Sequence, residues 1–200
     1  MRVDDRVVLV TGSVTGIGKA IARRVRAAGG RPVVHGPDPD AARAVAAELG
    51  AAAWVAGDLA DPDVPARLIA ETVAACGAVH GLVNNAASTA RSTLETTDAA
   101  FFDRMIAVNV RAPLLLIRAA LPHFRAQGGG KVVNIGSTNA HCGERGLLAY
   151  AVSKGALLTL TRNLADAHGA EGIRVNQINP GWTLTENEYA IKVQDGLPED

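Results

Sequence analysis

Three residues near the middle of the chain have types and a spacing that suit proton transfer at an oxygen atom. Tyr150 and Lys154 are four positions apart, so on a helix they lie on one face, one turn apart. A free phenol has a pKa of about 10, but a fixed ammonium close by favours the phenolate and lowers that pKa. Ser137 follows the apolar residues 132–135 and could donate a hydrogen bond to the same oxygen. This spacing predicts an acid/base group that acts on a carbonyl or an alcohol.

A tyrosine and a lysine four residues apart are also common on helix surfaces, where they only pack. Four of the 20 Lys and Arg residues are lysines, so the chain mostly uses Arg for positive charge. Lysine is the compact charge whose pKa is easily shifted. Read together with the glycine-rich start described next, the pair favours catalysis over surface packing.

The start of the chain has the pattern of a nucleotide-binding turn. An apolar run over residues 7–10 leads into a Gly-x3-Gly-x-Gly turn and then an amphipathic segment over residues 19–28. Such glycines let the backbone approach a pyrophosphate, and the following helix offers unpaired N–H groups, although glycines also serve ordinary tight turns. The predicted phosphate-binding residues are Gly12, Thr15, Gly16, Ile17 and Gly18.

The remaining pattern alternates strands and helices. Strands are predicted over residues 7–10, 32–35, 52–56, 79–83, 131–135 and 174–178, and helices over 19–28, 40–49, 62–76, 101–124 and 150–168, with a possible kink at Pro113. This alternation predicts a single-domain α/β fold over residues 1–200: a doubly wound, mostly parallel sheet of the Rossmann type in three layers.

Several polar or small residues follow the predicted strands. In open α/β sheets ligands bind at the carboxyl ends of the strands, so these residues should converge in one crevice with Ser137 and Tyr150. Two have plainer alternatives, because Asp58 could cap a turn and Asn109 could be a hydrogen-bonded core amide. The further predicted cofactor-binding residues are Asp58, Leu59, Asn85, Ala86, Pro180, Gly181, Thr183 and Thr185.

Composition limits the partners. The chain has 48% hydrophobic residues and a net charge of zero, which fits one globular domain and gives no electrostatic footprint for nucleic acid or an anionic membrane. No uninterrupted apolar run suggests a membrane span, and the N-terminus has no signal-peptide pattern. The two cysteines and five histidines form no metal-ligand spacing, so we expect no metal and a cytoplasmic location.

Taken together, these motifs resemble the short-chain dehydrogenase/reductase family over nearly the whole chain. The turn from Thr11 to Gly18 is similar to its cofactor turn, and residues 84–87 are similar to its Asn-Asn-Ala-Gly segment, with Ala87 in place of the glycine. Asn109, Ser137, Tyr150 and Lys154 occupy the places of its catalytic tetrad. The segment Pro180-Gly181 with Thr183 and Thr185 resembles its nicotinamide clamp.

The resemblance implies hydride transfer between C4 of NAD(P) and a carbonyl or secondary alcohol carbon. Tyr150 would be the acid/base and Ser137 would polarise the substrate oxygen. Lys154 would bind the nicotinamide ribose and lower the Tyr150 pKa, and Asn109 would hold a proton-relay water. Family members usually continue past this point, so the lid region 183–200 is expected to be incomplete. The family also implies a homodimer or homotetramer built on helices 101–121 and 150–168, whose apolar residues extend nearly all round.

Cofactor choice and substrate depend on less specific features. No basic residue stands in the glycine turn or directly after the second strand, where His35 should be mostly neutral, and Asp38 lies near the distance at which an acid meets ribose hydroxyls. We therefore predict NAD rather than NADP, unless Arg43 swings back toward the cofactor. His141 and Glu144, in a polar loop beside Ser137, favour a sugar, polyol or hydroxy acid as the small-molecule substrate. The alternatives are a 3-oxoacyl-thioester reductase and a catalytically silent binding module; a nucleotide-sugar epimerase or dehydratase usually carries a larger C-terminal domain.

Overall fold

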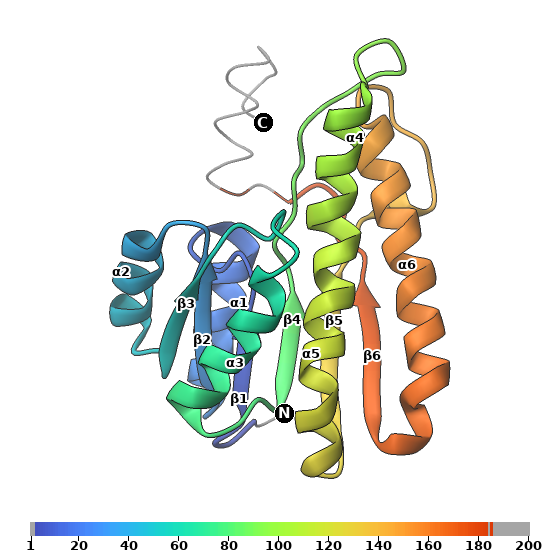
Figure 1. The fold of residues 1–200 in the computed structure, drawn as a ribbon. Helices are drawn as coiled ribbons and strands as arrows, with labels where there is room; N and C mark the ends of the chain where they lie inside the picture. The colour runs from blue at the N-terminus through green and yellow to red at the C-terminus, as the bar shows by residue number, and fades with distance from the viewer. Residues whose placement is uncertain (1–2, 184, 186–200) are drawn as a thin grey trace.

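A parallel six-stranded sheet forms the centre of the molecule. The computed structural model describes residues 3–183 and residue 185 (Figure 1). The sheet order is β3-β2-β1-β4-β5-β6, and every neighbouring pair is parallel. The strands are β1 (Val7–Val10), β2 (Arg31–Gly36), β3 (Ala53–Ala56), β4 (Gly81–Asn84), β5 (Gly130–Ile135) and β6 (Ile173–Ile178). The order reverses between β1 and β4, which is where a ligand crevice is expected in such sheets.

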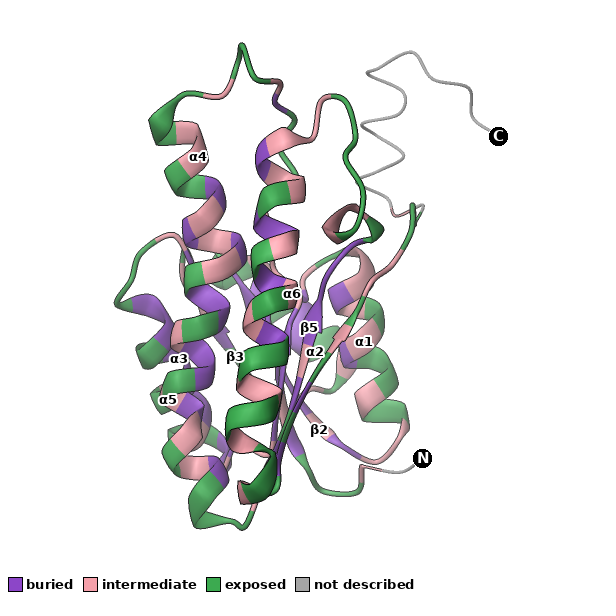
Figure 2. Cartoon of the chain, turned by 90° about the vertical axis from the view of Figure 1, so that its right-hand side faces the viewer, coloured by how far each residue is buried: buried purple, intermediate pink, exposed green. Residues whose placement is uncertain are grey.

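Helices cover both faces of the sheet and complete the three layers that the sequence predicted. Helices α1 (Gly16–Ala27) and α2 (Pro39–Leu49) lie on one face (Figure 1). The other face carries α3 (Val64–Cys76), α4 (Ala99–Ile106), α5 (Ala112–Ala126) and α6 (Leu148–His168) (Figure 2). The predicted doubly wound α/β fold is confirmed.

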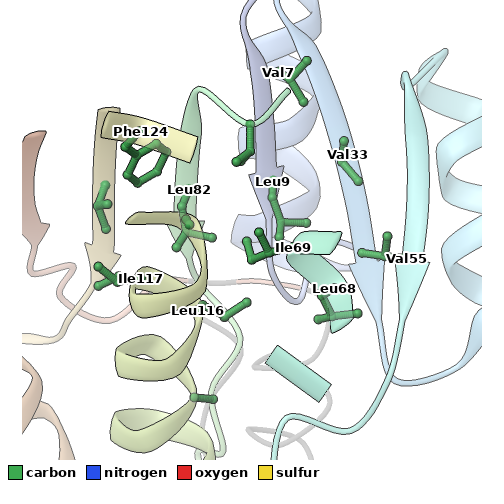
Figure 3. Close-up of a cluster of buried hydrophobic side chains, with 14 of the residues drawn as sticks. Val7, Leu9, Val33, Val55, Leu68, Ile69, Leu82, Leu116, Ile117 and Phe124 are labelled. Atoms are coloured by element: carbon green, nitrogen blue, oxygen red, sulfur yellow. The ribbon is translucent and has the colours of Figure 1, made fainter. Parts of the chain in front are cut away.

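The hydrophobic core explains why the strand sequences are apolar without alternation. The largest buried cluster lies between the sheet and the helices α3 and α5, and includes Leu9, Val33, Leu68, Leu82 and Phe124 (Figure 3). Smaller clusters lie on the opposite face, under α1 and α2. A parallel sheet that is covered on both faces buries both sets of side chains.

The helix predicted over residues 101–124 contains an irregular turn. The structure has α4, a π-helical segment over Ala107–Arg111, and then α5. Pro113 lies in the first turn of α5, just after this segment. Asn109, one of the predicted tetrad residues, sits in the middle of the π turn, and such single π turns frequently occur at functional sites.

One helical stretch is longer and more apolar than the sequence prediction allowed. Ala99–Ala126 has the length and composition of a membrane span, with a hydropathy of 1.4 in its most apolar window. Core helices pass the same test, and here Met105, Leu116, Ile117 and Phe124 are almost completely buried within the fold. This burial is typical of a helix that packs on the sheet of a globular domain.

Candidate active site

The predicted residues from different strand ends meet in one cleft. The cleft has a volume of about 980 Å³ and lies along the carboxyl ends of the strands. Its lining includes six of the residues that the sequence predicted to meet in one crevice: Gly12, Asp58, Asn85, Ser137, Tyr150 and Thr185. Also in the lining are Thr15, Gly16, Ile17, Leu59, Ala86, Glu144, Lys154, Pro180, Gly181 and Thr183.

The glycine turn adopts a conformation that other residues would strain. Gly12 and Gly16 have φ angles of 60° and 52°. A Cβ atom on Gly18 would lie 2.3 Å from the carbonyl oxygen of Gly12, so Gly18 lies under the turn rather than in the cleft lining. Thr15 makes no side-chain cap to α1, and the first turn of that helix has no acidic residue. The first N–H groups of α1 are therefore well placed to bind an anion.

Hydrogen bonds join this turn to the end of β4. The Oγ1 atom of Thr11 accepts bonds from the N–H groups of Asn85 and Ala86 at 3.0 and 3.1 Å. The Asn85 side chain donates to the carbonyls of Thr11 and Gly12 at 2.9 and 3.0 Å. Asn85 therefore holds the turn as well as lining the cleft. Sequence reasoning did not single out Thr11, although its place directly after the first strand was a usable signal.

Lys154 is the most buried charged group of the site. It is 3% exposed, and its Nζ atom donates to the carbonyl of Ile135, at the end of β5, at 2.7 Å. The same atom lies 5.5 Å from the centre of the Tyr150 ring. Burial lowers the pKa of Lys154 to about 8. Within residues 3–183 and 185, no carboxylate forms an ion pair with Lys154.

The other two tetrad positions differ in their exposure to the cleft. Ser137, 8% exposed, follows β5, lines the cleft and accepts a hydrogen bond from Asn139 N at 3.1 Å. Asn109 is not part of the lining. Its side chain accepts from Ser88 N at 2.8 Å and donates to Ser88 O at 3.0 Å and to the Ser153 hydroxyl at 2.9 Å. It therefore has the contacts of a satisfied core amide, the alternative raised from its sequence context, and it ties the Ser88 loop to α6.

Asp58 caps a turn and also lies in the cleft lining. Its side chain accepts from Ala60 N at 2.9 Å. This hydrogen bond and the nearby Arg104 guanidinium, 3.1 Å away, lower the pKa of Asp58. Arg104 lines the cleft too, and sequence reasoning missed it because it is 46 residues from its partner.

Asp38 does not lie where the sequence placed it. It is the N-cap of α2 and accepts from Asp40 N at 3.0 Å, and it is not in the cleft lining. Since Pro39 starts the helix at once, one oxygen of this carboxylate caps α2. Arg43 is exposed and pairs with Asp40 at 2.8 Å, so it is engaged away from the cofactor turn.

The two substrate residues predicted from the loop after Ser137 also separate. Glu144 lines the cleft and accepts from Asn139 at 2.9 Å. His141 does not line it, and its Nε2 atom lies 3.3 Å from the side-chain nitrogen of Asn179. Sequence reasoning missed one wall of the cleft. The segment after β4 forms this wall with Ser88, Thr89 and Arg91.

Comparison with known proteins supports this architecture. The family model described as short chain dehydrogenase matches residues 6–195. The chain is 36% identical to 2-(R)-hydroxypropyl-CoM dehydrogenase of Xanthobacter autotrophicus, over 98% of this chain and 84% of that protein.

Solved structures agree with the sequence comparison. A gluconate 5-dehydrogenase from Burkholderia cenocepacia, in complex with NADP and tartrate, superposes with a TM-score of 0.88 at 31% identity, over 94% of this chain and 76% of that one. A 3-ketoacyl-(acyl-carrier-protein) reductase from Brucella melitensis, complexed with NADH, gives a TM-score of 0.87 at 31% identity, over 92% and 78%. The chain therefore belongs to the short-chain dehydrogenase family.

Proposed function

We propose that the protein is an NAD(P)-dependent oxidoreductase that acts on a carbonyl or a secondary alcohol, with the cofactor and the substrate in the cleft described above. The observation that carries this proposal is the place of Lys154. Its buried ammonium is tied to Ile135 O at 2.7 Å and lies beside the Tyr150 ring in the same cleft as the glycine turn.

The residues present fit a dinucleotide. A Cβ atom on Gly12 would lie 2.8 Å from the Cα atom of Ala86, so a side chain there would disrupt the wall of the turn. The uncapped start of α1 suits a pyrophosphate. Lys154 has three N–H donors, and among the described residues its Nζ atom donates to Ile135 O, so donors remain for ribose hydroxyls. Pro180, Gly181, Thr183 and Thr185 form the wall expected to hold the nicotinamide.

A nicotinamide cofactor bound in this cleft would supply or accept the hydride. Tyr150 is placed to move a proton to or from the substrate oxygen, and Ser137 to donate a hydrogen bond to that oxygen. Lys154 favours the phenolate of Tyr150 by its charge. Asn109, which bonds Ser88 and Ser153 behind the cleft, supports the loop beside the reacting groups. The family resemblance also gives it the place of the residue that would hold a proton-relay water.

NAD is the proposed cofactor rather than NADP. A 2′-phosphate needs a cation within hydrogen-bond reach. Burial lowers the pKa of His35 to about 4, so this residue is neutral at pH 7. Arg104 is paired with Asp58 and Arg43 with Asp40. The NADP complex of the similar gluconate dehydrogenase makes this preference the first property to measure.

A polar substrate is proposed from the cleft wall. The cleft that contains Ser137 and Tyr150 is also lined by Ser88, Thr89, Arg91, Asn139 and Glu144. These groups suit a sugar, polyol or hydroxy acid, and a similar structure is a gluconate dehydrogenase. A 3-oxoacyl-thioester reductase is the second candidate, because another similar structure is a 3-ketoacyl reductase.

The assembly and location are proposals as well. Leu114 on α5 and Val152 on α6 are 40% and 49% exposed, and a second copy that covers these helices would bury them. A homodimer or homotetramer is proposed on this surface.

Cys76 and Cys142 are free thiols, in keeping with a reducing cytoplasm. We treat residues 1–200 as one domain; its proposed lid lies mostly outside the described residues.

A turnover screen tests the function. The purified protein is assayed with NAD and NADP against sugars, polyols, hydroxy acids and 3-oxoacyl thioesters. Turnover of a polyol or hydroxy acid with NAD is the expected result. Activity confined to thioesters would select the second candidate, and cofactor binding without any turnover would support a silent binding module.

A further inference from the structure

His35 connects two parts of the cleft that are far apart in the sequence. It lies near the end of β2, is 2% exposed and lines the cleft. Its Nδ1 atom accepts a hydrogen bond from Gly12 N at 3.0 Å. Its Nε2 atom lies 3.1 Å from Gly57 O. Because Nδ1 accepts, the ring proton belongs on Nε2, which then donates to Gly57.

The orientation of this ring is held by its own backbone. The N–H group of His35 donates to the Ser13 hydroxyl at 3.0 Å, and that hydroxyl donates to Val10 O at 2.7 Å. Ser13 N donates in turn to His35 O at 2.8 Å. The glycine turn and the end of β2 are thus joined by both backbone and side-chain bonds.

The two groups that His35 bonds belong to two separate segments of the proposed dinucleotide subsite. Gly12 starts the turn that leads into α1, where the pyrophosphate is proposed. Gly57 follows β3 and precedes Asp58, a proposed cofactor-binding residue in the same cleft lining. We propose that His35 is a positioning residue, which holds the turn after β1 and the loop after β3 together as one preformed cofactor surface. This inference rests on the proposed assignment of the cleft to NAD(P).

The neutral ring is the form that can do this. A protonated imidazole donates from both nitrogens and cannot accept from Gly12 N. Burial, together with the Arg67 guanidinium on α3, opposes the charge and lowers the pKa of His35, while the bond to Gly57 opposes that shift only in part. The ring therefore keeps its acceptor at neutral pH.

Three substitutions separate positioning from general stability. His35→Asn places an amide oxygen near the Nδ1 position and keeps the acceptor for Gly12. His35→Gln keeps a donor near the Nε2 position, and His35→Leu removes both bonds. The dissociation constant for NADH, measured by nicotinamide fluorescence at fixed salt, should rise about tenfold to a hundredfold in His35→Leu, because two buried backbone groups lose their partners. His35→Asn and His35→Gln each keep one of the two bonds, so each should recover only part of this loss.

Val33→Ala is the matched control. Val33 lies two residues earlier on the same strand, is fully buried and does not line the cleft. It should lower the thermal stability while leaving the NADH dissociation constant within about twofold of wild type.

The outcomes distinguish this inference from the proposed function. A wild-type protein that fails to bind either cofactor would refute the assignment of the cleft itself. Wild-type binding with unchanged affinity in His35→Leu would refute the positioning role. Should His35→Leu fail to fold, His35→Asn and His35→Gln decide, since wild-type affinity in either variant would contradict the need for both bonds.

Discussion

Lys154 reaches from the first turns of α6 to the last residue of β5, where its Nζ atom donates to Ile135 O at 2.7 Å. Ile135 precedes Gly136 and Ser137 directly. The bond therefore ties the helix that carries Tyr150 to the strand end that carries Ser137. The relative position of these two oxygen-binding groups depends on a contact between residues 19 positions apart.

Tyr150→Phe should abolish turnover while the cofactor still binds. The phenol is the group in the cleft suited to protonating a substrate oxygen, and loss of a general acid/base costs on the order of 100- to 10,000-fold in rate. Initial rates with the best substrate of the screen and the NADH dissociation constant are the measurements. A wild-type rate in Tyr150→Phe would contradict the assignment.

The burial of Lys154 predicts how stability changes with alkaline pH. The pKa of Lys154 is lowered from 10.5 to about 8 in the folded chain. Between these two pH values the unfolded chain binds a proton that the folded chain does not. The free energy of unfolding should therefore increase as the pH is raised from 8 to 10.5. The contribution is about 3 kcal/mol.

Urea unfolding of the cofactor-free protein at several pH values checks this expectation. Lys154→Met removes the titrating group, so its curve should be flatter than the wild-type curve between pH 8 and pH 10.5. Lys131 lies on β5 and is exposed, so Lys131→Met serves as the control and should keep the wild-type slope. Parallel curves for wild type and Lys154→Met would show that this lysine is not the group responsible.

The protein should bind NADH more tightly than NADPH, and a substitution at one position should shift this preference toward NADPH. Pro37 lines the cleft directly after β2, where the sequence has no basic residue. Pro37→Arg should tighten NADPH binding about tenfold, because a guanidinium can bond the 2′-phosphate. Dissociation constants for both reduced cofactors decide the matter. Tighter wild-type binding of NADPH than of NADH would mean that a backbone group or another cation already supplies this contact.

The proposed oligomer should depend on the exposed apolar side chains of α5 and α6. Leu114→Glu or Val152→Glu places a charge in the proposed interface, and light scattering at micromolar concentration should then show a smaller species than wild type. Trp54 is 40% exposed and lies on β3, at the opposite edge of the sheet from β6. Its substitution serves as the control, because it changes an exposed hydrophobic side chain outside the proposed interface. A monomeric wild-type protein would refute the interface.

Local pattern was sufficient for the elements and for the place of the site. The apolar run of β1, the glycines after it and the alternation of strands with helices follow from short-range rules, and parallel strands bring their carboxyl ends to one edge. Gly12, Asn85, Ser137 and Tyr150 could therefore be assigned to one cleft before any coordinates were known. The Tyr150–Lys154 pair also needed no tertiary information, because one helix sets its spacing.

The tertiary structure decided which polar groups serve the cleft and which serve the fold. Asp38 has a favourable distance from the glycine turn in sequence, but its carboxylate caps α2 and lies outside the cleft lining. The sequence predicted Asn109 as a catalytic residue with a core amide as the alternative, and in the fold the π turn places its side chain against Ser88 and Ser153. His35 and Arg104 bond partners 22 to 46 residues away. Contacts at such separations depend on strand order and side-chain direction, which no local spacing encodes.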